Sequence, residues 1–232
     1  KGFVNAILRA IHREKDSILK TVHHSHPSWL AKKIKKDYPL NYNEIFLENN
    51  KKAPMSIRVH PSIDVNTFQE KLKKQNIFSE VSEIAPQALI LDQAVKVSSL
   101  PDFEKGSCYV QDLSAQLAGQ LISPKKGELI LDACCAPGGK TTHIAELCPG
   151  ADIVALDNDE VRLLKVKENT DRLKINNVKT ILGDATSQDW WNQIQFDKIL
   201  IDAPCTGTGV IRRHPDIQLL RKPKDVGHIT KI

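Results

Sequence analysis

The segment best suited to chemistry is residues 132–140, which read DACCAPGGK. It follows the apolar run 129–131, so we expect it to leave a buried strand and to open a helix. Its two glycines let a ligand approach the backbone, and the first N–H groups of a helix lack intrahelical partners. The spacing differs from GxGxxG, and from a P-loop, which needs four residues between its Gly and its Gly-Lys. We therefore expect a ligand loop that belongs to neither class.

Three acidic residues follow the next apolar runs of the chain, namely Asp157, Asp184 and Asp202. The carboxyl ends of parallel strands meet at one edge of a sheet, where α/β folds bind their ligands. An acidic residue after the second strand typically accepts hydrogen bonds from ribose hydroxyls. The three together predict a nucleoside-sized crevice, although each one alone could equally form a turn or cap a helix.

A cysteine lies at the same expected edge, within residues 202–209 (DAPCTGTG). Pro204 restricts the backbone just before Cys205, which favours a thiol presented to the crevice. The alternative is a packing residue, the usual role of a cysteine after a strand. The chain has five cysteines in all, an odd set without zinc-ligand spacing, so no metal site is predicted. The other four are Cys108, Cys134, Cys135 and Cys148.

The elements that position these residues alternate between strand and helix patterns from residue 127 onward. We expect strands at 129–133, 152–156, 179–182 and 196–201, and helices at 141–148 and 159–173. Such alternation predicts a parallel, doubly wound sheet of the Rossmann-like α/β class. The loop and the three acidic residues then lie at the carboxyl ends of its strands.

Before residue 127, the spacing of apolar residues along the chain changes twice. Residues 3–14 and 28–38 carry apolar residues at helical spacing, with Ser25 and Pro27 resembling a helix start. After a linker at 51–54, a small α+β unit is predicted. Its expected elements are a strand at 56–60, a helix at 65–75, strands at 88–91 and 94–97, and a helix at 114–122. We thus expect an all-α segment (1–48), a small α+β domain (49–122) and the doubly wound domain (123–232).

Charge is distributed unevenly along the chain, whose formal net charge is +5. Residues 1–60 hold 12 Lys and Arg against 5 Asp and Glu, a charge of +7, whereas residues 61–232 hold 21 against 23, a charge of −2. A basic end beside a nearly neutral body suits an RNA backbone as partner. A solvated helix face rich in lysine would give the same pattern.

The sequence shows neither a signal-peptide pattern nor an apolar run of roughly 20 residues, the length that a membrane span needs. Unpaired cysteines without a secretion signal favour a reducing cytoplasm. The chain starts at Lys1 rather than Met, and its first residues resemble the middle of a helix. We therefore expect further sequence upstream.

Residues 134–140 together with 202–205 resemble the RNA cytosine-5 methyltransferases. The stretches 209–217 (GVIRRHPDI), 109–115 (YVQDLSA) and 26–30 (HPSWL) are similar to the bacterial RsmB (Sun/Fmu) branch, which modifies small-subunit ribosomal RNA. This resemblance covers nearly the whole chain. It implies the end of a NusB-like RNA-binding domain, then a small linker domain, then an incomplete methyltransferase domain, in a protein that is a monomer when full length.

The resemblance also implies the cofactor, S-adenosylmethionine, and its binding residues. These are Cys134, Cys135, Ala136, Pro137, Gly138, Gly139, Lys140, Asp157, Asp184 and Asp202. In such enzymes a thiolate adds to carbon 6 of cytosine, which makes carbon 5 nucleophilic. Asp202 corresponds to the carboxyl group that assists protonation of the ring, and Cys205 to the cysteine that resolves the adduct. The attacking cysteine is expected downstream of this chain, which alone is then expected to be inactive.

Two alternatives stay open on the sequence. One is a binding protein that holds cofactor and RNA without activity, because the attacking cysteine is missing. The other is an amino-group methyltransferase, which usually carries an Asp/Asn-Pro-Pro-aromatic motif. Residues 202–205 (DAPC) depart from that motif and make the second alternative the weaker one.

Overall fold

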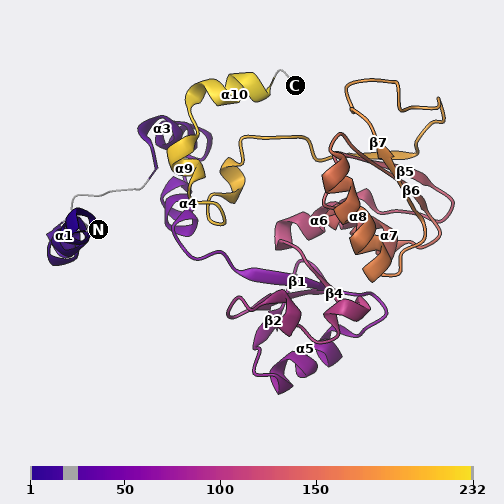
Figure 1. Cartoon of the computed structure of the whole chain (residues 1–232), viewed down its shortest axis with the longest axis horizontal. Coiled ribbons are helices and arrows are strands. Elements are labelled where there is room, and N and C mark those ends of the chain that lie inside the picture. Colours follow the sequence, from indigo (N-terminus) through magenta and orange to yellow (C-terminus); the bar gives the residue numbers. More distant parts are fainter. Residues whose placement is uncertain (1, 18–25, 231–232) are drawn as a thin grey trace. The chain divides into compact units, whose positions relative to one another are not determined.

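The computed structural model of the chain describes residues 2–17 and 26–230 (Figure 1). It consists of two compact units. One is Pro54–Pro204, and the other joins Lys1–Ala53 with Cys205–Ile232. None of the described helices is both long and apolar enough to cross a membrane.

The unit Pro54–Pro204 begins with a four-stranded antiparallel sheet in the order β2-β3-β1-β4. Its elements are β1 (Met55–Val59), α5 (Val65–Lys74), β2 (Ser79–Val81), β3 (Ala88–Leu91), the 3₁₀ turns η1 (Val97–Ser99) and η2 (Phe103–Lys105), and β4 (Cys108–Val110). The Asp64 carboxylate caps α5 by accepting from the Thr67 amide at 2.8 Å. Phe68 and Leu72 of that helix are fully buried against the sheet. Burial of this one helix face gives the sheet its core.

Most of the expected elements of this small sheet are confirmed, at 56–60, 65–75 and 88–91. The expected strand at 94–97 is wrong, because these residues run irregularly into η1. Val95 packs against the core without a strand partner, which explains its apolar pattern. The short strands β2 and β4 were not predicted.

The second part of the same unit is a parallel sheet in the order β7-β6-β5-β8. Its elements are α6 (Leu113–Ile122), β5 (Leu129–Ala133), α7 (Gly139–Leu147), β6 (Asp152–Asp157), α8 (Glu160–Arg172), β7 (Val178–Leu182) and β8 (Lys198–Ile201). Ile130, Ile144 and Ile153 form a fully buried cluster between sheet and helix. The prediction of a parallel, Rossmann-like sheet is confirmed.

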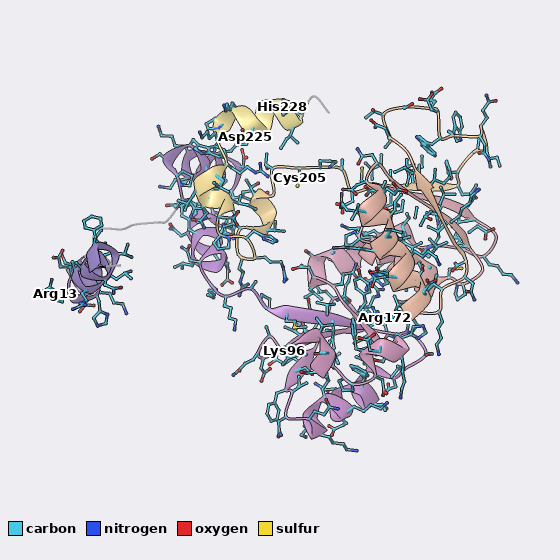
Figure 2. All side chains as sticks on the ribbon, in the orientation of Figure 1. Arg13, Lys96, Arg172, Cys205, Asp225 and His228 are labelled. Carbon is cyan, nitrogen blue, oxygen red and sulfur yellow. The ribbon has the colours of Figure 1, made fainter. Side chains whose placement is uncertain are left out.

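The two sheets of this unit are joined at close range. Gly106 has a φ of +81°, and a Cβ built there would lie 2.5 Å from the Arg172 carbonyl oxygen of α8. Arg172 also donates to the Phe103 and Cys108 carbonyls at 2.9 and 3.0 Å (Figure 2). Only glycine permits this approach, so the antiparallel sheet is held firmly against α8.

The other unit is helical in its described residues. It contains α1 (Gly2–Arg13), α3 (Ser28–Asp37), α4 (Tyr42–Asn49), the 3₁₀ turn η3 (Thr208–Val210), α9 (Ile217–Leu220) and α10 (Pro223–Ile229). Arg212 ties its two chain segments together, with Nη1 3.3 Å from Glu48 and Nε donating to the Lys52 carbonyl. Ser25, part of the predicted helix start, lies outside the described residues. The likeness of residues 1–48 to a NusB domain, and the predicted domain boundaries, remain predictions.

Candidate cofactor site

The loop after β5 makes a tight bend before α7. Cys134 adopts a positive φ of 62°, and Gly138 a φ of 96° at the N-cap of α7. The Cys135 amide donates to the Leu156 carbonyl at 3.0 Å, and the Gly138 amide to Cys135 at 2.8 Å. A Cβ at Gly138 would meet Val166 at 3.2 Å, so α8 packs directly against the bend. The structure thus brings predicted residues 134–140 into one compact loop at the carboxyl end of β5.

Asp157 ends β6 and is buried beside this loop. One carboxylate oxygen accepts from the Ala136 amide at 3.0 Å, and the other from the Asp159 amide at 3.1 Å. Arg162 of α8 lies 3.7 Å from the carboxylate. An ionised carboxylate has about four acceptor positions, so Asp157 holds the loop and still has capacity for a ligand hydroxyl.

Asp184 lies just beyond β7 and is exposed. Its carboxylate accepts from the Thr186 amide at 2.8 Å and from the Thr186 hydroxyl at 2.7 Å. The backbone hydrogen bond first, and the hydroxyl second, hold the pKa of Asp184 below its ordinary value. Trp190 Nε1 donates to the Asp184 carbonyl at 2.9 Å and fixes the turn. The residue is thus kept ionised at the edge that carries the loop.

Asp202 follows β8 and pairs with Lys140 at the start of α7, with Nζ and Oδ2 2.5 Å apart. Asp202 is more than half exposed, whereas Lys140 is about three-quarters covered. Their pairing spans the gap between β5 and β8, which are adjacent parallel strands. The structure therefore brings Lys140, Asp157 and Asp202, as predicted, to the carboxyl ends of three neighbouring strands.

Asp132 was read only as the start of the motif, yet it is the most buried carboxyl group of the site. It has no exposed surface and accepts from the Thr141 hydroxyl at 2.6 Å through Oδ2, while Oδ1 has no partner. Burial raises the pKa of Asp132 to about 6, against the opposing effect of Thr141. An orphaned buried carboxyl oxygen at this position suits a donor group on a bound ligand. The sequence did contain a signal for this role, because an Asp within the apolar run 129–133 is expected to be buried.

The cysteines of the site differ in reactivity. Burial, followed by the charges of neighbouring Asp157 and Asp132, raises the pKa of Cys134, and burial raises that of Cys135 far more. Both thiols are therefore protonated and poor nucleophiles. Cys205 is exposed, and its sulfur accepts from the Gly207 amide at 3.4 Å (Figure 2). It is the first residue of the chain segment that returns to the helical unit. Among the described residues, no cluster of His, Cys, Asp and Glu could hold a metal ion.

The basic segment 1–60, predicted to suit an RNA partner, includes α3. Lys32, Lys33, Lys35 and Lys36 are all exposed. Lys33 pairs with Asp37 at 2.9 Å, and the Lys35 ammonium lies 5.1 Å from the centre of the Tyr42 ring. Four cations on one short helix leave most of their charge free for a polyanion.

Comparison with known proteins gives two matching family models. Residues 119–232 match the 16S rRNA methyltransferase RsmB/F family, and residues 26–98 match the ferredoxin-like domain of RsmF/B-like methyltransferases. Ribosomal RNA small subunit methyltransferase B of Vibrio vulnificus is 45% identical over the whole of this chain, which covers 56% of that protein. The chain thus spans about half the length of the curated relatives it matches.

Two solved structures are similar in fold to this chain. A methyltransferase homolog protein from Pyrococcus horikoshii is 29% identical with a TM-score of 0.74, and the alignment covers 87% of this chain and 64% of that one. NSun6 from Pyrococcus horikoshii, solved with SFG, has a TM-score of 0.80 at 23% identity, covering 90% of this chain and 78% of that one. The second likeness concerns the fold alone.

Proposed function

Because the chain belongs, through both matched domains, to the RsmB/F family of methyltransferases, we propose that it binds S-adenosylmethionine and serves methyl transfer to carbon 5 of a cytosine in small-subunit ribosomal RNA. The observation that carries this proposal is the grouping of the 134–140 loop with the strand-end carboxylates Asp157 and Asp202. We place the protein in the cytoplasm, where its five free cysteines would stay reduced.

The residues of the site fit this cofactor. We assign the ribose hydroxyls to Asp157, the base to the turn at Asp184, and the amino-acid end to the loop and its neighbour Asp132. The free oxygen of Asp132 can accept from an ammonium group, and the first N–H groups of α7 can donate to a carboxylate. When bound, S-adenosylmethionine supplies an electrophilic methyl group on a positively charged sulfur, which carboxylates at three strand ends would attract.

The proposed chemistry at the base begins with a thiolate that adds to carbon 6 of cytosine, while a proton reaches the ring nitrogen. We assign Asp202, at the carboxyl end of β8, to assist that proton transfer, and Lys140, which pairs with it, to orient its side chain. Carbon 5 then takes the methyl group, and the sulfur that carried it leaves as a neutral thioether. Loss of the protons on carbon 5 and on the ring nitrogen, with departure of the thiolate from carbon 6, restores the aromatic ring. We assign the attacking thiol to a cysteine outside this chain, since burial keeps Cys134 and Cys135 protonated.

We assign Cys205 to the release of the product. A thiol that helps to dismantle the methylated adduct is not required to form it. In a protein of the relatives' full length, Cys205→Ala should therefore accumulate a covalent RNA complex that persists on a denaturing gel. A covalent complex that this chain forms by itself and loses on Cys205→Ala would make Cys205 the nucleophile instead.

Two measurements test the proposal as a whole. Calorimetric titration of S-adenosylmethionine into the chain should show one site, and a chain that binds none would remove the cofactor assignment. Transfer of a labelled methyl group to small-subunit RNA by the full-length protein, mapped to its base, tests the target atom. A label on an exocyclic amino group rather than on carbon 5 would contradict the cysteine chemistry. No feature of the described residues favours a binding protein without activity.

A further inference from the structure

Arg58 of β1 is a buried cation that the proposed chemistry does not use. Its side chain is 1% exposed, and Nε donates to Glu146 Oε2 at 2.8 Å. The two guanidinium nitrogens donate to Gln111, to the Gly139 carbonyl at 3.0 Å and to the Thr142 hydroxyl at 3.1 Å. One arginine of the antiparallel sheet thus reaches the first turn of α7, which follows the cofactor loop.

Helix electrostatics alone do not account for this placement. The N-terminus of a helix carries a partial positive charge, so a cation beside the first turn of α7 is unfavourable. Glu146, near the end of the same helix and also almost fully buried, compensates the charge of Arg58. A buried ion pair is seldom more stable than apolar residues of the same size. What Arg58 adds is a fixed position for the Gly139 carbonyl, and with it for the peptide group that joins Gly139 to Lys140.

A second contact from the same sheet supports the loop beside this position. Tyr109 of β4 lies under Gly139, where a Cβ would be 3.4 Å from the Tyr109 ring. Asn169 of α8 donates to the Pro137 carbonyl at 3.1 Å and contacts the Tyr109 hydroxyl at 3.4 Å. The Arg58 guanidinium lies 5.1 Å from the centre of the Tyr109 ring. The two carbonyls that flank Gly138 are therefore bound by side chains outside the loop. Asn169 of α8 binds that of Pro137, and Arg58 of the antiparallel sheet binds that of Gly139.

We propose that Arg58 is a positioning residue for the cofactor loop, so that the antiparallel sheet sets the affinity of the methyltransferase sheet for its cofactor. This inference rests on the proposed function, since the ligand is S-adenosylmethionine. Arg58 binds the Gly139 carbonyl oxygen, whereas the proposed ligand requires the N–H groups at the start of α7. It acts on the cofactor through the loop.

The test compares matched variants of the 232-residue chain. Arg58→Met alone would leave Glu146 buried and unpaired, so Arg58→Met/Glu146→Leu is the main variant, because it removes both charges together. Arg172→Met is the control. Arg172 also joins the antiparallel sheet to α8, but it donates to the Phe103 and Cys108 carbonyls and lies 3.9 Å from the centre of the Phe103 ring and 5.7 Å from that of Tyr109, so these contacts are with the antiparallel sheet rather than with the loop.

The first readout is calorimetric titration with S-adenosylmethionine. The double variant should bind roughly tenfold more weakly or worse, the usual scale for losing hydrogen bonds to a charged group. Arg58→Lys should recover part of that loss, because one ammonium can satisfy some of the acceptors. Arg172→Met should bind like the unchanged chain. Equal affinity in the double variant, or an equal loss in Arg172→Met, would overturn the inference.

The second readout needs no cofactor. Amide hydrogen exchange of a peptide covering 134–142 should quicken in the double variant and stay unchanged in Arg172→Met. If the unchanged chain binds no S-adenosylmethionine, the proposed function fails, and this exchange still decides whether Arg58 orders the loop. Unchanged exchange in the double variant would refute the positioning role independently of the ligand.

Discussion

At the scale of single residues, Asp157 has two tasks, since it holds the Ala136 amide of the loop and is the proposed acceptor for ribose hydroxyls. Asp157→Ala should weaken S-adenosylmethionine binding by about 1–3 kcal/mol, the range for a hydrogen bond to a charged group. Calorimetry on the chain measures this loss. Asp159→Ala is the matched control, because the Asp159 side chain caps α8 by accepting from the Arg162 amide at 3.0 Å, whereas its contact with Asp157 is made by the backbone amide, which alanine keeps. The Asp159→Ala variant should be less stable but should bind the cofactor as the unchanged chain does. If Asp157→Ala also binds the cofactor as tightly as the unchanged chain, Asp157 is not part of the site.

Two buried titratable residues should give this protein opposing pH dependences. Burial raises the pKa of Asp132 to about 6 and lowers that of His143 to about 3. The folded chain therefore holds the Asp132 proton more tightly, and this contribution to the free energy of unfolding falls as pH rises from about 4 to 6. The buried imidazole of His143 must stay neutral, so its contribution falls as pH drops from about 6.5 towards 3.

Single variants should separate these two effects. Relative to the unchanged chain, Asp132→Asn should gain stability at about pH 7 compared with about pH 4.5, by up to roughly 2 kcal/mol. His143→Gln should gain at the lower pH instead. Urea unfolding of each variant and of the unchanged chain at both pH values measures these differences. The contributions of the surface carboxylates are common to both proteins and cancel. Parallel pH profiles for the two variants would show that burial does not control these groups.

At the scale of elements, the contact between α6 and α7 depends on a glycine. A Cβ at Gly119 would lie 2.5 Å from the His143 ring. Gly119→Ala should gain about 1 kcal/mol of helix propensity and lose about 1–3 kcal/mol by overpacking, a net fall in stability. Adding His143→Ala should reverse that fall. Gly227→Ala in α10, where an added Cβ would meet no packed neighbour within 4 Å, should be neutral or stabilising, and thermal unfolding distinguishes these outcomes.

Elements with strong local patterns were predictable from the sequence, and elements defined by distant partners were not. The run 129–133 is apolar apart from Asp132, the run 152–156 is mostly apolar and is followed by Asp157, and both are strands of the parallel sheet. β4 has three residues and exists because it pairs with β1, whose sequence is about 50 positions away. The role of Arg58 was missed for the same reason, since its partners Glu146 and Gly139 are brought to it only by the fold.

At the scale of the whole molecule, the uneven charge distribution predicts which part of the chain would contact the proposed RNA substrate. Residues 1–60 carry +7 and the remainder −2, and α3 contributes four exposed lysines to the basic part. Counterions released from a nucleic acid by bound cations make the affinity fall with salt. Each lysine that contacts a phosphate contributes roughly one unit to the slope of log affinity against log salt concentration.

Replacing Lys32, Lys33, Lys35 and Lys36 with serine should therefore weaken binding to small-subunit RNA and flatten its salt dependence by up to about three units. A matched control replaces the exposed lysines Lys73, Lys74, Lys165 and Lys167, which carry the same total charge. The control also reproduces the local pairing, because Lys167 binds Asp171 at 3.0 Å as Lys33 binds Asp37. Fluorescence anisotropy at several salt concentrations measures both slopes. Equal flattening in the two variants would mean that only net charge matters, and an unchanged slope in the α3 variant would make that helix a solvated face without a role in RNA binding.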